Sequence, residues 1–124
     1  MQVLINILNN AKDELIKKKE QELFIFIDVF LENSNINICI KDNAGGIDEN
    51  IIDRIFEPYF TTKEQSQGTG IGLYMSEEIV VKHMKSKLIV QNTEYTYDNV
   101  IYRGAEFKII INKDNENFKK IEDS

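Results

Sequence analysis

Residues 35–47, NINICIKDNAGGI, join an alternating apolar run to a turn that carries two glycines. The regular spacing of Ile36, Ile38 and Ile40 is typical of a β-strand. Aspartate, asparagine and glycine directly after such a run favour a tight turn, because they tolerate the backbone angles that turns require. We therefore predict a strand over residues 35–43, followed by a loop.

A second strand is predicted just before this one, over residues 22–33, with the connection at residues 32–35. Its aromatic residues alternate with branched ones, so we expect both faces of this strand to be covered. Residues 2–20 have helical periodicity and predict an amphipathic helix. The apolar stripe of that helix consists of Val3, Leu4, Ile7, Leu8, Ala11 and Leu15.

Downstream, residues 48–56 predict a short helical segment, and residues 57–70 a polar surface loop. A second long helix follows, and two further strands are expected, joined by a turn at Asp98-Asn99. The order helix, strand, strand, loop, helix, strand, strand predicts an α+β fold, a two-layer sandwich with helices on one face of a mixed sheet. Residues 1–112 form the expected domain, and residues 113–124 a charged tail.

The composition restricts the class of protein. A chain of 124 residues with 42% hydrophobic and 29% charged residues fits one soluble domain with a single core. A net charge of −6 argues against non-specific nucleic-acid binding, and no apolar run is long enough to cross a bilayer. The single cysteine, Cys39, excludes an internal disulfide, fits a reducing cytoplasm and is expected to be a buried strand residue.

Two clusters of polar residues suggest a nucleotide site. Asn6 and Asn10 lie four residues apart on one helix face, and an amide oxygen is a suitable ligand for Mg²⁺. Asp42 can accept a hydrogen bond from the exocyclic amine of adenine, while Gly45 and Gly46 allow close approach to a flat base. The alternatives are a solvated helix face for the asparagines and simple turn chemistry for the second cluster.

Two further clusters suggest contacts with phosphate. The glycine-rich run at 68–73, GTGIGL, precedes a helix, so its N–H groups can converge on an anion. It matches neither the P-loop nor the dinucleotide fingerprint. Residues 56–63, FEPYFTTK, are typical of a hinged flap, in which Lys63 is either a mobile charge for phosphate or a solvated loop lysine.

Taken together and in order, INILNNA (5–11), DNAGGI (42–47), FEPYFTTK (56–63) and GTGIGLYMS (68–76) resemble the motifs of one known family. That family is the catalytic, ATP-binding domain of sensor histidine kinases, which is related to gyrase, Hsp90 and MutL-type ATPases. The resemblance runs from residue 2 to about residue 111. It implies the Bergerat-type ATP-binding fold, with a mostly antiparallel sheet.

The resemblance also implies roles for single residues. Asn10 would coordinate Mg²⁺, Asp42 would recognise adenine, and Asn6 and Lys63 would occupy the catalytic positions. Hydrolysing relatives have a general-base glutamate where this chain has Asn6, so ATP hydrolysis is disfavoured and phosphoryl transfer is retained. The other expected nucleotide contacts are Asp13, Gly46, Ile47, Thr61, Thr62, Gly68, Thr69, Gly70, Ile71, Gly72 and Leu73.

The chain departs from the family pattern in several places. Asp13 replaces a common lysine, so either Lys12 or Lys63 would contact the phosphates, and GAEF (104–107) replaces a threonine-bearing motif. His83 does not match a phosphoacceptor. The chain opens inside the first helix of the pattern. We therefore expect a fragment of a longer kinase, with an open sheet edge that favours weak homodimerisation.

The resulting functional hypothesis is a cytoplasmic domain that binds ATP and Mg²⁺. It would transfer the γ-phosphate to a histidine on a separate dimerisation domain, with a response regulator downstream. The parent protein is either soluble or membrane-anchored, and the domain itself would contact neither membrane nor nucleic acid. The alternatives are a serine kinase of the anti-sigma-factor type and a nucleotide-binding interaction module without catalysis.

Overall fold

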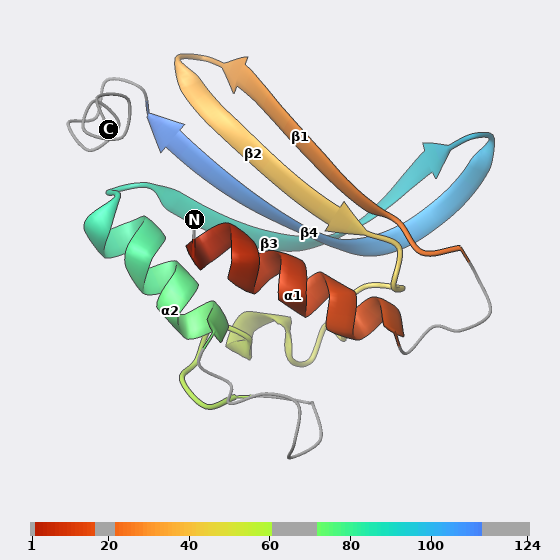
Figure 1. The fold of residues 1–124 in the computed structure, drawn as a ribbon, viewed down its shortest axis with the longest axis horizontal. Coiled ribbons are helices and arrows are strands. Elements are labelled where there is room, and N and C mark those ends of the chain that lie inside the picture. The colour runs from red at the N-terminus through yellow and green to blue at the C-terminus, as the bar shows by residue number, and fades with distance from the viewer. Residues whose placement is uncertain (1, 17–21, 61–71, 113–124) are drawn as a thin grey trace.

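The computed structural model describes residues 2–16, 22–60 and 72–112. Helices and strands follow the predicted order (Figure 1). They are α1 (Gln2–Ile16), β1 (Ile25–Glu32), β2 (Asn35–Asp42), the 3₁₀ turn η1 (Ile52–Arg54), α2 (Gly72–Glu78), the π-helical η2 (Ile79–His83), β3 (Lys87–Tyr97) and β4 (Val100–Asn112).

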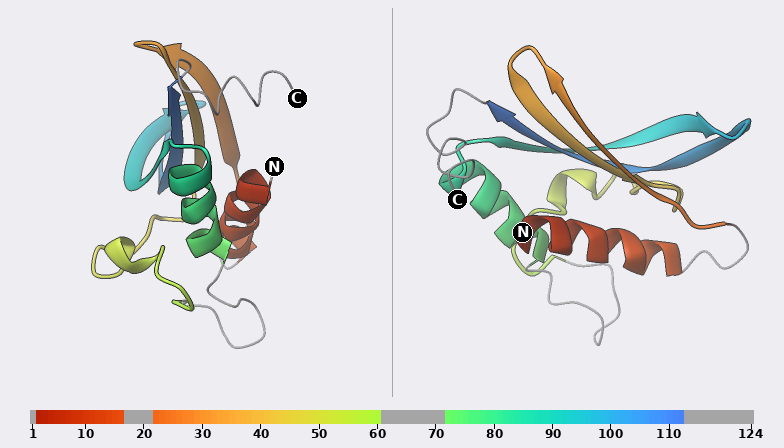
Figure 2. Two further views of the ribbon diagram at one scale, coloured as in Figure 1. Left: turned by 90° about the vertical axis from the view of Figure 1, so that its left-hand side faces the viewer. Right: turned by 45° about the horizontal axis from the view of Figure 1, so that its top comes forward.

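The four strands form one sheet in the order β1-β2-β4-β3, and each of its three described strand pairs is antiparallel. The two α-helices lie side by side on one face of this sheet (Figures 1 and 2). The predicted two-layer α+β architecture is therefore confirmed.

Both hairpins close through two-residue turns in which both residues have positive φ. Asn33 and Ser34 connect β1 to β2, and Asp98 and Asn99 connect β3 to β4. This geometry matches the right-handed twist of the flanking strands, and Asn and Asp adopt it at low cost. The turns predicted at residues 32–35 and 98–99 are confirmed.

The core lies between the helices and the middle of the sheet. The buried stripe of α1 faces inward-pointing residues of β2 and β4, and Phe107 at 1% exposure is the largest side chain that is fully buried. The buried cluster consists of Val3, Ile7, Ile40, Ile55, Val80, Ala105, Phe107, Ile109 and Ile111.

The expectation that both faces of β1 are covered is wrong. Ile27, Val29 and Leu31 are 55%, 65% and 66% exposed. Their partners across the ladder are residues of β2, and α1 packs more closely against β2 than against β1. Because β1 is the outer strand of the described sheet, the helical layer ends before it reaches these side chains.

The opposite face of the sheet carries an aromatic cluster. The rings of Phe24 and Phe26, at the start of β1, contact those of Tyr95, Tyr97 and Tyr102 near the β3–β4 turn. Edge-to-face contacts of this kind stabilise a fold beyond simple burial. They fasten β1 to the far end of the β3–β4 hairpin.

Two residues of β2 lie as a strand at this place in the sheet requires. Cys39 is buried in β2, as predicted, and burial raises the pKa of its thiol. Ile38 packs against the hydrophobic core, as a strand residue at that position should.

Gly104 on β4 lies against the backbone of Asp42 at the end of β2, and a substitution there tests this close approach. A Cβ at this position would lie 1.7 Å from the carbonyl oxygen of Asp42, whereas a Cβ at Gly72 would meet its nearest neighbour, the Asn6 side chain, at 3.8 Å. We expect Gly104→Ala to lower the free energy of unfolding by about 3 kcal/mol, because the backbone must shift. Gly72→Ala should leave it unchanged or slightly raised. Urea denaturation measures both, and equal effects would contradict the close approach.

Candidate functional site

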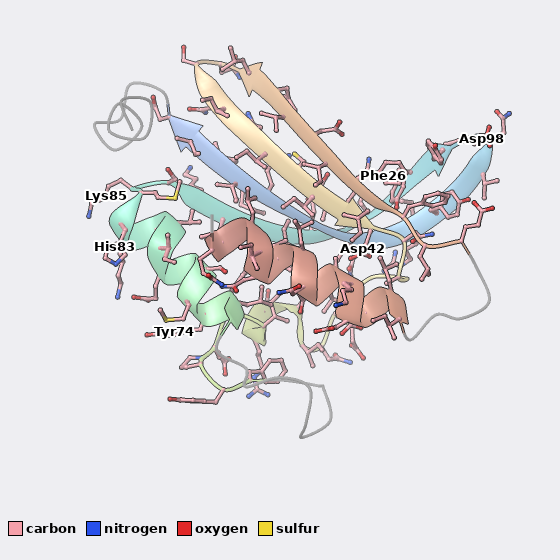
Figure 3. The ribbon with its side chains drawn as sticks, viewed as in Figure 1. Phe26, Asp42, Tyr74, His83, Lys85 and Asp98 are labelled. Carbon is pink, nitrogen blue, oxygen red and sulfur yellow. The ribbon has the colours of Figure 1, made fainter. Side chains whose placement is uncertain are left out.

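Asp42 ends β2 and is the most constrained polar residue of the site. Its side chain is only 4% exposed, and Oδ1 accepts hydrogen bonds from the N–H groups of Ala44 at 3.0 Å and Ala105 at 3.2 Å. The Tyr95 hydroxyl donates to the Asp42 carbonyl oxygen at 2.6 Å. These bonds set the rotamer and the backbone of Asp42, at the end of the sheet above the C-terminal half of α1 (Figure 3).

The electrostatics around Asp42 favour a partner that donates a hydrogen bond. Burial raises the pKa of Asp42 and the charge of Glu14 adds to this, while the bonds from Ala44 and Ala105 lower it. A desolvated carboxylate gains more than an exposed one from a ligand N–H group. Burial and the Asp42 charge raise the pKa of Tyr95 to about 12, so its hydroxyl remains a donor.

The loop after Asp42 is fastened at both ends. The Asn43 side chain accepts from Phe24 N–H at 2.9 Å and donates to the Glu22 carbonyl at 2.7 Å. Gly45 exchanges two bonds with Arg103: its N–H donates to the Arg103 carbonyl, and Arg103 Nε donates to the Gly45 carbonyl.

The two glycines of this loop have positive φ, at 98° for Gly45 and 94° for Gly46. A Cβ on Gly46 would lie 2.8 Å from Asn92 Oδ1. Within the described residues, the space beside Gly46 is therefore occupied by a protein side chain, and contact of this glycine with a base stays a prediction.

Asn6 connects the two helices. Its Nδ2 donates to the Gly72 carbonyl at 3.2 Å and to Ser76 Oγ at 3.1 Å, and its Oδ1 accepts from Gln2 at 2.8 Å. Ser76, which is fully buried, also donates to the Gly72 carbonyl. The amide predicted at a catalytic position thus holds the first turn of α2 against α1.

Asn10, the predicted Mg²⁺ ligand, is half-buried one turn further along the same face of α1. Among residues 2–16, 22–60 and 72–112, no group of three or more His, Cys, Asp or Glu side chains could hold a metal ion. A single amide oxygen suits a Mg²⁺ ion whose other ligands are water molecules and phosphate oxygens of a nucleotide. It does not suit an ion that is held by protein ligands alone.

The remaining predicted residues fall into two groups. Ile47 and Leu73 pack against the core, Asp13 is half-buried on α1, and Lys12 is exposed. Thr61, Thr62, Lys63, Gly68, Thr69, Gly70 and Ile71 lie outside the described residues.

His83 lies away from this arrangement. It is exposed at the end of η2, and Figure 3 shows it at the opposite end of the helical layer from Asp42. Separately, no helix in the described part of the chain has the length and apolar character needed to cross a membrane.

Sequence reasoning missed Asn92, Tyr95, Arg103 and Ser76. One signal was available for Asn92, which continues the inward-facing series of Leu88 and Val90 on β3. A polar residue at a core-facing position needs a specific partner.

Comparison with known proteins places this chain within a family. Residues 1–115 match the family described as histidine kinase-, DNA gyrase B- and HSP90-like ATPases. The chain is 36% identical over 94 residues to the two-component sensor PprA of Pseudomonas aeruginosa, covering 73% of this chain and 10% of that protein. It is 38% identical over 110 residues to the signal transduction histidine-protein kinase AtoS of Escherichia coli, covering 89% and 16%.

Solved structures agree with these relatives. The catalytic domain of histidine kinase ThkA, in a nucleotide-free form, has a TM-score of 0.68 at 28% identity. That match covers 90% of this chain and 64% of the other. The resemblance predicted from the four motifs is confirmed.

The raised pKa of Asp42 predicts how stability depends on this residue. The Asp42 carboxyl binds a proton more readily in the folded protein than in the unfolded chain. The free energy of unfolding therefore falls as pH rises from the ordinary pKa of an aspartate through the raised pKa of Asp42. Asp42→Asn keeps an oxygen for the two backbone donors and removes the buried charge. We expect it to raise the free energy of unfolding at pH 7, by an amount that shrinks as pH is lowered. Exposed Asp28→Asn is the control in chemical denaturation, and a less stable Asp42→Asn would contradict the assignment.

The Asn6 contacts predict a second effect. Asn6→Asp removes the donor to the Gly72 carbonyl and sets a carboxylate against it, which should cost about 2 kcal/mol of unfolding free energy. Asn9→Asp makes the same chemical change on the exposed side of α1 and should cost little. Equal losses for the two variants in urea denaturation would show that Asn6 does not connect the helices.

Proposed function

Because the chain belongs to the family of histidine kinase-, DNA gyrase B- and HSP90-like ATPases, we propose that it binds Mg·ATP as the catalytic domain of a sensor histidine kinase. The chain spans 10% of PprA and 16% of AtoS, so the activity of the whole protein is part of this proposal.

The order of groups along α1 supports an extended nucleotide. Glu14, in the last turns of α1, is close enough to influence the pKa of Asp42. Asn10 lies about one turn nearer the N-terminus, and Asn6, one turn further, holds Gly72 at the end of the predicted phosphate loop. Base acceptor, metal ligand and phosphate loop thus follow the order of adenine, Mg²⁺ and terminal phosphate in Mg·ATP.

Adenine recognition would rest on Asp42. Its Oδ1 is committed to two backbone donors, so the carboxylate can present its other oxygen to the exocyclic amine of adenine. Guanine carries a carbonyl oxygen at that position, which a carboxylate repels. The site should therefore select ATP over GTP.

The chemistry that fits best is phosphoryl transfer to an external acceptor. The Asn6 amide cannot take a proton near neutral pH, and its donor is already bonded to Gly72 and Ser76, so it cannot activate water. In transfer, an imidazole nitrogen of the acceptor would attack the γ-phosphorus while the bond to the β,γ-bridging oxygen breaks. The products are phosphohistidine and ADP.

The role of the domain in this step is to position ATP. Asn10 would hold Mg²⁺, which neutralises charge on the phosphate oxygens, and Lys63 with the N–H groups of the 68–72 loop would orient the γ-phosphate. The acceptor histidine would lie on a separate dimerisation domain, and a response regulator would take the phosphate onward. Use of cellular ATP would require the domain to lie in the cytoplasm.

Titration calorimetry tests the nucleotide site. We expect ATP to bind with Mg²⁺, GTP to bind at least about 30-fold more weakly, and Asp42→Asn to lose about 2 kcal/mol of ATP binding energy. Asp28→Asn is the matched control. Equal affinities for ATP and GTP in the folded protein would refute adenine recognition by Asp42.

Labelled ATP tests the reaction. The chain alone should release almost no phosphate, whereas addition of a helical domain bearing an acceptor histidine should yield an acid-labile, alkali-stable phosphoprotein. Transfer to a serine-bearing partner alone would favour the serine-kinase alternative. Brisk phosphate release by the chain alone would contradict the assignment of Asn6.

A further inference from the structure

The side chain of Asn92 pairs with a backbone segment as a neighbouring strand would. Ile47 N–H donates to Asn92 Oδ1 at 2.7 Å, and Asn92 Nδ2 donates to the Ile47 carbonyl at 2.7 Å. Two residues of an antiparallel ladder exchange the same pair of bonds. Asn92 Nδ2 also donates to Glu49 Oε1 at 2.8 Å.

The segment that Asn92 holds owes its shape to side-chain and loop contacts rather than to regular secondary structure. Residues 43–49 belong to no helix or strand, and Gly45 and Gly46 at its centre have the greatest conformational freedom to lose. Arg103 restrains Gly45, and Asn92 restrains the chain two residues later. Both restraints come from the β3–β4 hairpin.

We propose that Asn92 is a positioning residue of the nucleotide site, which keeps the 45–47 backbone in the shape that receives adenine. This inference rests on the proposed function. Asn92 would act through Ile47 and Gly46, both predicted to line the base. Without Asn92, the loop would populate other conformations. The apparent affinity for ATP would then fall in proportion to the fraction of molecules that keep the adenine-receiving conformation.

The pairing requires an amide at this position. Alanine would remove both bonds, and aspartate would keep the acceptor for Ile47 N–H while setting a carboxylate against the Ile47 carbonyl and Glu49. Glu49→Gln would supply a donor that the introduced carboxylate can accept. The loss of ATP affinity in Asn92→Asp should therefore be partly reversed by Glu49→Gln. A loss of affinity caused by general destabilisation of the fold would not be reversed in this way.

The first experiment needs no nucleotide. Amide hydrogen exchange of the free protein should show Ile47 protected in wild type and exchanging about tenfold faster in Asn92→Ala, as loss of one hydrogen bond of about 1.4 kcal/mol implies. Gln91→Ala is the matched control, because Gln91 is the adjacent amide and bonds Glu106 across the strand pair. Unchanged Ile47 exchange in Asn92→Ala would overturn the inference.

The second experiment measures Mg·ATP affinity at a temperature where all variants are folded. We expect Kd to rise about tenfold in Asn92→Ala and Asn92→Asp, to recover severalfold in Asn92→Asp/Glu49→Gln, and to change less than about twofold in Gln91→Ala. Wild-type affinity in both Asn92 variants would overturn the inference and leave the proposed function standing. Absence of ATP binding by wild type would instead overturn the proposed function, and the positioning of nucleotide with it.

Discussion

A carboxylate buried at the end of β2 is the constraint on which the rest of the site depends. Asp42 is desolvated, so its charged form must be compensated by fixed donors, and two backbone N–H groups provide them. One donor belongs to Ala105 on β4, which requires β4 to pass against Asp42. Only glycine at position 104 permits that approach, since any Cβ would overlap the Asp42 carbonyl.

The β3–β4 hairpin extends this constraint to the loop that follows. Tyr95 binds the Asp42 carbonyl, Arg103 binds Gly45, and Asn92 binds Ile47. The aromatic cluster on the outer face of the sheet attaches the same hairpin to the start of β1. The loop proposed to bind adenine is therefore held by a hairpin that carries none of the four sequence motifs and only the altered GAEF stretch.

On the helical side, α1 performs two tasks with two faces. Its apolar stripe covers the middle of the sheet, while Asn6 on another face bonds Gly72 and Ser76 of α2. A hydrolytic relative would need a free base at the position of Asn6. Here that side chain is used for helix packing, which agrees with transfer of phosphate rather than hydrolysis.

Local patterns in the sequence were enough to predict the element order, both hairpin turns, the stripe of α1 and the family, because each depends on residues close together in the chain. Asp42, Asn10 and the glycines could be proposed for the same reason. The exposure of β1 could not be predicted, because alternation in a strand does not reveal how far the helical layer reaches. Nor could the contacts of Asn92 with Ile47, Tyr95 with Asp42, or Asn6 with Gly72. These join residues 45, 53 and 66 positions apart, and only the packing of the hairpin and helices brings them within bonding distance.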